Sequence, residues 1–111
     1  MAEHLDLDAL AELKDIMEEE FVMLLETYIV DADKKIIELA DAVTKKDPKA
    51  ITSVAHSLKG ASSNVSAVNL AGMCKTLEHK GRDNDLTDLE ACYQRIKDEY
   101  VHVKAALQAQ M

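Results

Sequence analysis

Residues 48–65 read PKAITSVAHSLKGASSNV, and their apolar side chains recur at the three- and four-residue steps of an amphipathic helix. Asp47 and Pro48 favour a helix start here, because aspartate is a good N-cap and proline fits the first helical position. On a helical wheel, one arc of about 100° forms the predicted core seam. The residues in this arc are Ile51, Val54, Ala55, Leu58, Ser62 and Val65. His56 lies well outside the arc, so its imidazole is predicted to face solvent.

Three more stretches of the chain show helical periodicity. The first runs from Glu18 to Lys46, as one helix or as two with a bend near Asp31. The next begins at Ser66 or Asn69 and ends near Lys80 with Gly81 as its C-cap, and the last carries apolar residues from Leu86 to Leu107. A short helix beginning at Asp6 or Asp8 precedes them. The sequence therefore predicts an all-α fold in a single domain over residues 1–111: an up-down antiparallel four-helix bundle with a short extra N-terminal helix.

Composition and charge restrict the classes of partner. The formal net charge of −8 disfavours nucleic acid and anionic membranes. We find neither a signal peptide in the acidic N-terminal stretch nor an apolar run long enough to span a bilayer. Cys74 and Cys92 are far apart and fit buried free thiols in a reducing cytosol. We expect a cytoplasmic monomer with no nucleic-acid or membrane partner.

The outer face around His56 combines residues suited to phosphoryl chemistry. Imidazole is a competent nucleophile near neutral pH. Lys59 is three residues away, so its ammonium can reach a phosphoryl group on His56 and balance its charge. Gly60 costs about 1 kcal/mol relative to alanine inside a helix, but it leaves room beside the imidazole. Thr52 and Ser63 complete this face, with Ser63 the closer hydroxyl.

Residues 56–67, HSLKGASSNVSA, resemble the signature of histidine phosphotransfer (HPt) domains, H-x-L-K-G-x-S-x-x-φ-G-A, in which φ is apolar. Leu70, Leu77 and Glu78 also fit, and the resemblance to stand-alone bacterial HPt proteins covers nearly the whole chain. It implies a phosphoryl carrier without kinase activity, which accepts a phosphoryl group from a receiver-domain aspartate onto His56 and passes it to a response regulator. Ser66 departs from the family's glycine, which we expect to lie near the docking surface; serine is small enough for docking to survive.

The same resemblance implies the partners: receiver domains of a hybrid sensor histidine kinase and of a response regulator. We expect no metal or cofactor in this chain, since the receiver should supply Mg²⁺. Docking is expected on Thr52, Gly60, Ser63 and Ser66. A hairpin turn near residues 66–67 would bring Glu78 level with His56, where family members often hold a His-orienting Glu or Gln. Otherwise Glu78 is a solvated surface charge.

Two other functions remain open. The first is a helical receiver-binding module without phosphate turnover, against which the intact His56 and Lys59 argue. The second is a metal-binding bundle, because Glu99 and His102 match the E-x-x-H half-motif of di-iron bundles; such bundles need two of these motifs. His4, His79 and His102 otherwise fit ordinary surface or boundary residues. Met17, Met23 and Met73 fit core filler rather than a recognition patch.

Overall fold

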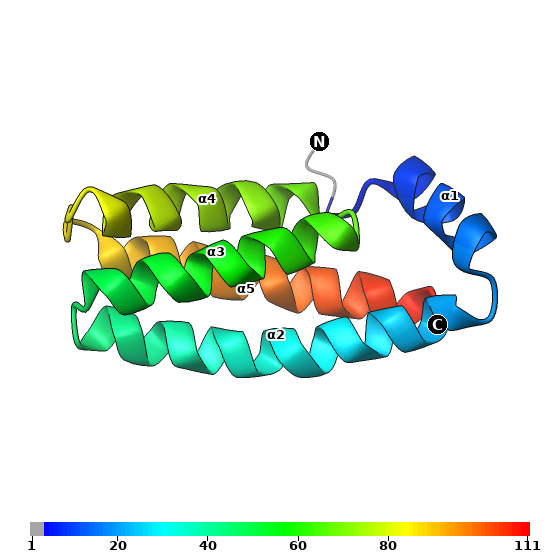
Figure 1. Ribbon diagram of the computed structural model, residues 1–111, viewed down its shortest axis with the longest axis horizontal. Helices are drawn as coiled ribbons and strands as arrows, with labels where there is room; N and C mark the ends of the chain where they lie inside the picture. Colours follow the sequence, from blue (N-terminus) through cyan, green and yellow to red (C-terminus); the bar gives the residue numbers. More distant parts are fainter. Residues whose placement is uncertain (1–3) are drawn as a thin grey trace.

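The computed structural model describes residues 4–111, and within them it contains helices and no strand. The five helices are α1 (Leu7–Met17), α2 (Glu20–Thr44), α3 (Pro48–Asn64), α4 (Val68–Arg82) and α5 (Leu89–Ala109). Figure 1 shows α2 to α5 running alongside one another, with α1 set at an angle at one end. The predicted all-α bundle with a short extra N-terminal helix is confirmed. None of the helices in residues 4–111 is both long and apolar enough to cross a membrane.

The helix starts follow the predicted capping chemistry. Asp6 caps α1 by accepting a hydrogen bond from the Ala9 backbone N–H at 3.1 Å. Asp47 caps α3 in the same way, with Ala50 as the donor at 3.3 Å and Pro48 at the first helical position. The long stretch after residue 18 forms one helix without a break at Asp31. These caps fix where α1 and α3 begin.

One apolar core fills the bundle, and each of the four long helices contributes to it. Its large side chains are at most 1% exposed and include Phe21, Leu25, Leu39, Ile51, Leu58, Leu70, Leu77, Ile96 and Leu107. Cys74 and Cys92 are free thiols within this core, as predicted. Burial raises the pKa of the Cys74 thiol to about 12, so this thiol is protonated and inert at neutral pH.

The helices α2, α3 and α4 end in the same backbone motif. In each, the residue two positions after the helix has a left-handed backbone: φ is 51° at Lys46, 64° at Ser66 and 56° at Asn84. After α3, the Ala67 N–H donates to the Ser62 carbonyl at 2.9 Å, and the Ser66 N–H donates to the Ser63 carbonyl at 3.0 Å. The other two helix ends repeat this pair of bonds, which defines a Schellman motif. All three turns are therefore closed by backbone groups without a glycine.

Gly81 differs from the prediction that it caps α4. The helix continues to Arg82, Asn84 takes the left-handed position, and no glycine has a positive φ. Instead, Gly81 is buried where α4 crosses close to α3. A Cβ on Gly81 would lie 2.5 Å from the Thr52 Oγ1 and 3.0 Å from the Pro48 carbonyl oxygen. Glycine is needed here for close helix packing rather than for chain reversal.

Candidate functional site

His56 lies on the outer face of α3, as the helical wheel predicted. Its side chain is 66% exposed, whereas Ile51, Ala55, Leu58 and Ser62 of the predicted seam are fully buried. Val65 is also buried and Val54 is half-buried. The core seam therefore anchors α3 and leaves the imidazole accessible to another molecule.

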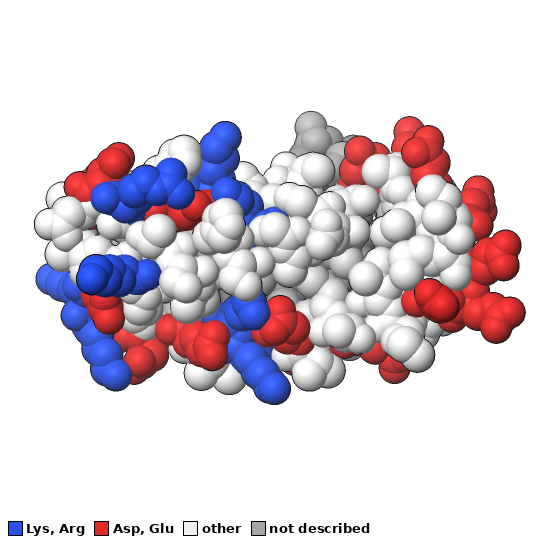
Figure 2. Space-filling model, viewed as in Figure 1, with Lys and Arg blue, Asp and Glu red and all other residues white. Residues whose placement is uncertain are grey.

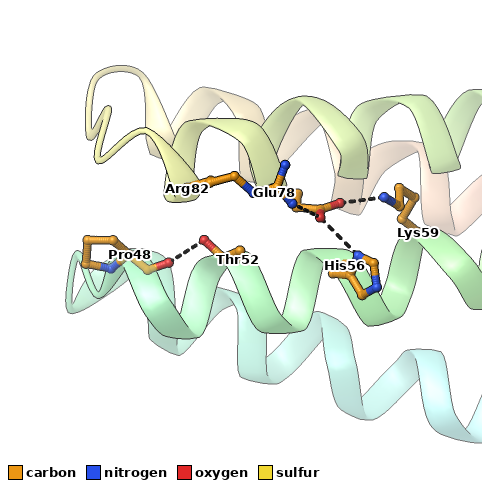
Figure 3. Close-up of polar contacts among 6 residues, drawn as sticks. All are labelled: Pro48, Thr52, His56, Lys59, Glu78 and Arg82. Atoms are coloured by element: carbon orange, nitrogen blue, oxygen red, sulfur yellow. Dashed lines mark hydrogen bonds and ion pairs between the residues drawn. The ribbon is translucent and has the colours of Figure 1, made fainter.

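Glu78 on α4 is buried beneath the imidazole, with its side chain 2% exposed. Its Oε2 atom lies 2.9 Å from the His56 Nδ1 atom and accepts a hydrogen bond from the Arg82 Nη2 atom at 2.6 Å. Its Oε1 atom lies 2.7 Å from the Lys59 Nζ atom. Figure 3 shows the carboxylate between α3 and α4, with His56 and Lys59 reaching it from α3. Glu78 is therefore not a solvated surface charge.

The charges around Glu78 determine which nitrogen of His56 carries a proton. Lys59 and then His56 lower the pKa of Glu78, against the opposing effect of burial, from its usual value of 4.5 to about 2. At neutral pH the carboxylate is ionised and can only accept hydrogen bonds. In the neutral imidazole, the Nδ1 atom must therefore carry the proton and donate to Glu78. The Nε2 atom keeps its free electron pair.

Lys59 and Gly60 follow His56 on the same helix. The Lys59 side chain is 28% exposed and is held by Glu78. Gly60 is exposed, and a Cβ built on it would have no atom within 4 Å. The surface at Gly60 is therefore open, and Lys59 is the cation of α3 that is paired with Glu78.

Comparison with known proteins identifies the family of this chain. A family model for the Hpt domain matches residues 23–107, which include His56 and Glu78. The chain belongs to the Hpt family. It is also similar to the crystal structure of histidine-containing phosphotransfer protein B (HptB) from Pseudomonas aeruginosa PAO1, with 36% identity and a TM-score of 0.94 over 99% of this chain and 96% of that one. A search of curated proteins gives no match.

Among the expected docking residues of this Hpt chain, Thr52 and Ser63 lie on α3. Ser63 is exposed. Thr52 is half-buried, and its hydroxyl donates to the Pro48 carbonyl at 2.7 Å, so this hydroxyl is engaged within its own helix. Ser62 of the predicted core seam is fully buried, and its hydroxyl lies 2.8 Å from the Tyr28 hydroxyl.

Ser66 lies just beyond the end of α3, where it is buried, and its expected docking role stays a prediction. It is 9% exposed and forms the left-handed residue of the α3 cap. Its carbonyl accepts a hydrogen bond from the Asp6 backbone N–H at 2.8 Å, which ties the N-terminal segment to this turn. The glycine of the Hpt signature fits this position because a positive φ favours glycine.

Arg82 is the site residue that the sequence analysis missed. Its side chain is 57% exposed, and its guanidinium shares the Glu78 Oε2 atom with His56. The signal was available, because Arg82 follows Glu78 by four residues and this spacing places two side chains on one helix face.

Exposed apolar side chains on α2 lie on the side of this helix that faces away from the core. Met23, Val30 and Ile37 are spaced by seven residues and are 66%, 60% and 70% exposed. The assignment of Met23 to the core is therefore wrong, because it faces solvent opposite the buried side of α2. A shallow groove lined by Thr27 and Ala61, among others, joins this helix to α3. We call Met23, Val30 and Ile37 the α2 apolar stripe.

The remaining histidines lie outside this site. The His4 Nδ1 atom lies 2.8 Å from the buried Glu99 carboxylate, and the His4 ring stacks on His102 at 4.6 Å. His79 is exposed on α4. In the part of the chain that the structure describes, no group of three or more His, Cys, Asp or Glu side chains is arranged to hold a metal ion.

Proposed function

We propose that this Hpt protein is the phosphoryl carrier of a multistep phosphorelay, in which His56 accepts a phosphoryl group from a receiver-domain aspartate and passes it to a response regulator. The observation that carries the proposal is the orientation of His56. Its Nδ1 atom is bonded to a buried carboxylate, and its Nε2 atom belongs to an exposed ring beside an empty space. A protein that only binds receivers has no need of such an oriented nucleophile.

The chemistry is an in-line displacement at phosphorus. The Nε2 electron pair of His56 attacks the phosphorus of the aspartyl phosphate, the N–P bond forms, and the P–O bond to the aspartate carboxylate breaks. The ring gains positive charge as it reacts, and Glu78 accepts the Nδ1–H bond that stabilises this charge. In the second transfer, the aspartate of the next receiver attacks the same phosphorus and the Nε2 electron pair is released.

Lys59 is proposed as the counter-charge for the phosphoryl group. Its ammonium is already beside the ring, at 2.7 Å from Glu78, so a small rotation of its flexible side chain would bring it to a phosphoryl oxygen. The Mg²⁺ of the reaction is expected on the receiver. The protein would act without kinase activity, as a monomer in the cytoplasm, where its buried free thiols remain reduced.

We further propose where the receiver docks. It must cover His56 and the open space at Gly60, with Ser63 at the edge of the contact. Exposed apolar side chains that lie on one face of a free protein commonly belong to an interaction site. Met23, Val30 and Ile37 are such side chains on α2, and a groove lined by other residues of α2 and by Ala61 lies between this helix and α3. The receiver would therefore contact both helices.

The experiment is phosphotransfer from a labelled receiver domain to purified protein. Wild type should gain an acid-labile, base-stable label, as expected for phosphohistidine, and His56→Gln should gain none while keeping its helical circular dichroism. His79→Gln is the matched control, because His79 is also exposed but lies on the outer side of α4. A His56→Gln protein that still takes label would contradict the site. A wild type that binds receivers without taking label would support the receiver-binding alternative.

A further inference from the structure

A groove lies beside the His56 site, where the start of α3 meets the end of α4. It is lined by Pro48, Lys49, Thr52, Ser53, Gly81, Arg82 and Asn84. Thr52 is one helical turn before His56, and Lys49 is seven residues before it, which correspond to about 6 and 10 Å along the helix axis. The groove and the imidazole are therefore neighbouring features of one surface.

The lining of the groove is basic and rich in hydrogen-bond donors. Lys49 and Arg82 supply two positive charges, of which that of Arg82 is paired with Glu78, and no aspartate or glutamate is among the lining residues. Lys49 is exposed and forms no ion pair with any residue in the described range 4–111. The protein as a whole carries a net charge of −8, so the positive charge of this lining is opposite in sign to the net charge of the protein. Figure 2 shows Lys and Arg side chains in the half of the molecule that contains this groove, interspersed with Asp and Glu, whereas the opposite end carries Asp and Glu without Lys or Arg on this face.

The close packing of α3 against α4 forms the base of the groove. Gly81 lies against Thr52, where even a Cβ would come within 2.5 Å of the threonine hydroxyl. The next residue, Arg82, extends one guanidinium nitrogen to Glu78 and also lines the groove. The groove is thereby connected to the buried carboxylate that orients His56.

We propose that this groove receives a carboxylate-bearing loop of the receiver domain and contributes to the choice of receiver. The inference rests on the proposed phosphotransfer function. An interface of standard size buries about 800 Å² on each partner, so its edge lies roughly 15 Å from its centre. A receiver centred on His56 therefore covers the groove. A loop that carries a carboxylate matches the charge of Lys49 and of the Arg82 guanidinium.

Two substitutions test the groove without touching the reacting residues. Lys49→Glu reverses the charge of an exposed side chain in the first turn of α3, where an acidic residue also favours the helix, so folding is expected to persist. Asn84→Asp places an acidic group on the other wall, at a left-handed position that aspartate tolerates. Lys97→Glu on α5 is the matched control, because Lys97 is exposed and lies outside the groove.

The measurement is the single-turnover rate of transfer from a labelled receiver as a function of receiver concentration and salt. For Lys49→Glu we expect the half-saturating concentration to rise about tenfold, with the saturating rate unchanged and a weaker dependence on salt. Asn84→Asp should change in the same direction, and Lys97→Glu should match wild type. Equal half-saturating concentrations for Lys49→Glu and Lys97→Glu would overturn the proposal. A wild type that takes no label would instead overturn the phosphotransfer function itself.

Discussion

Gly81 on α4 lies against Thr52 on α3 without room for a side chain: a Cβ on Gly81 would come within 2.5 Å of the Thr52 Oγ1 atom and 3.0 Å of the Thr52 backbone nitrogen. This contact sets how closely the two helices approach. Glu78 lies one turn earlier on α4, and His56 lies one turn later on α3. The same close approach therefore allows the Glu78 carboxylate to reach the His56 ring at 2.9 Å.

Gly81→Ala is expected to destabilise the protein. Alanine would gain about 1 kcal/mol of helix propensity, but it must push backbone atoms of α3 away, and overpacking typically costs about 1–3 kcal/mol. Gly60→Ala is the matched control, because nothing lies within 4 Å of its Cβ position; it should gain up to about 1 kcal/mol. Urea unfolding of both variants measures the difference. Equal stabilities for the two variants would contradict the packing role of Gly81.

Lys59→Ala should slow phosphotransfer and also reduce stability. Removing the ammonium leaves the buried Glu78 charge with less compensation, and an unpaired buried charge is costly. Because Lys59 is 28% exposed, water can replace part of the interaction, and we expect a loss of about 1–2 kcal/mol.

The double variant Lys59→Ala/Glu78→Gln separates these two effects. With the buried charge also removed, most of the stability lost in Lys59→Ala should return. Transfer should be slower than in Glu78→Gln alone, because the double variant lacks the counter-charge as well as the carboxylate beside the ring. Thermal melting and single-turnover transfer on the same samples provide both readouts. A double variant that transfers as fast as Glu78→Gln alone would show that Lys59 acts only by supporting Glu78.

The pKa of Glu78 predicts an acid-dependent loss of stability. The pKa falls from 4.5 to about 2 on folding, so the folded protein holds the ionised form more strongly than the unfolded chain does. This stabilisation is complete above pH 4.5 and is lost as the pH falls towards 2, with a slope of at most about 1.4 kcal/mol per pH unit for one proton.

Glu78→Gln provides the reference for that measurement. Wild type should be more stable than Glu78→Gln at pH 7, and the difference should shrink between pH 4.5 and 2. The pKa values of Asp33 and Asp85 are also lowered, but both residues are present in both proteins and their effects cancel in the difference. A stability difference that does not vary with pH would contradict the assigned pKa.

Ser66→Gly should stabilise the bundle without changing phosphotransfer. Serine at φ 64° carries the left-handed strain that glycine avoids, so we expect a gain of up to about 1 kcal/mol, or a few degrees in Tm. Ser66→Val should have the opposite effect, because a β-branched side chain fits this conformation poorly. If Ser66→Gly changed transfer rates but not Tm, Ser66 would belong to the docking surface after all.

Periodicity and capping in the sequence predicted the bundle, the start of α3 and the exposure of His56, because each depends on local spacing. The helix ends were harder to predict. Lys46, Ser66 and Asn84 have left-handed backbones, and because none of them is a glycine the sequence did not indicate these helix ends. Gly81 was predicted to cap α4 but instead allows close packing of α4 against α3. Sequence spacing suggested that Glu78 would be level with His56, but its burial depends on how closely α4 approaches α3, which periodicity does not define.

The α2 apolar stripe was missed for a related reason. α2 carries apolar residues on two opposite faces, and a wheel that is apolar on both sides does not show which residues are buried. Met23 was assigned to the core on hydrophobicity alone. Met23, Val30 and Ile37 are seven residues apart and therefore share one face of the helix. The buried residues of α2, from Phe21 to Val43, share the opposite face, and this difference in helical position distinguishes the two apolar faces.

Val30→Asp is expected to impair receiver docking and leave the fold intact. Val30 is 60% exposed at the centre of the α2 apolar stripe, so aspartate there stays hydrated in the free protein and costs little stability. In a complex the same carboxylate would lose its water against the receiver, and a buried polar group without a partner costs about 1–3 kcal/mol. We therefore expect the half-saturating receiver concentration to rise about tenfold, which corresponds to about 1.4 kcal/mol.

Val101→Asp is the matched control, since Val101 is also 60% exposed but lies on α5, away from α3. It introduces the same charge on the same type of residue, so any general effect of added acidity appears in both variants. Transfer kinetics should separate them, with Val101→Asp equal to wild type and Val30→Asp slowed at low receiver concentration. The two rates should converge at saturation, because the stripe does not touch the reacting atoms. Equal kinetics for the two variants at every concentration would remove α2 from the docking surface and confine the contact to α3 and α4.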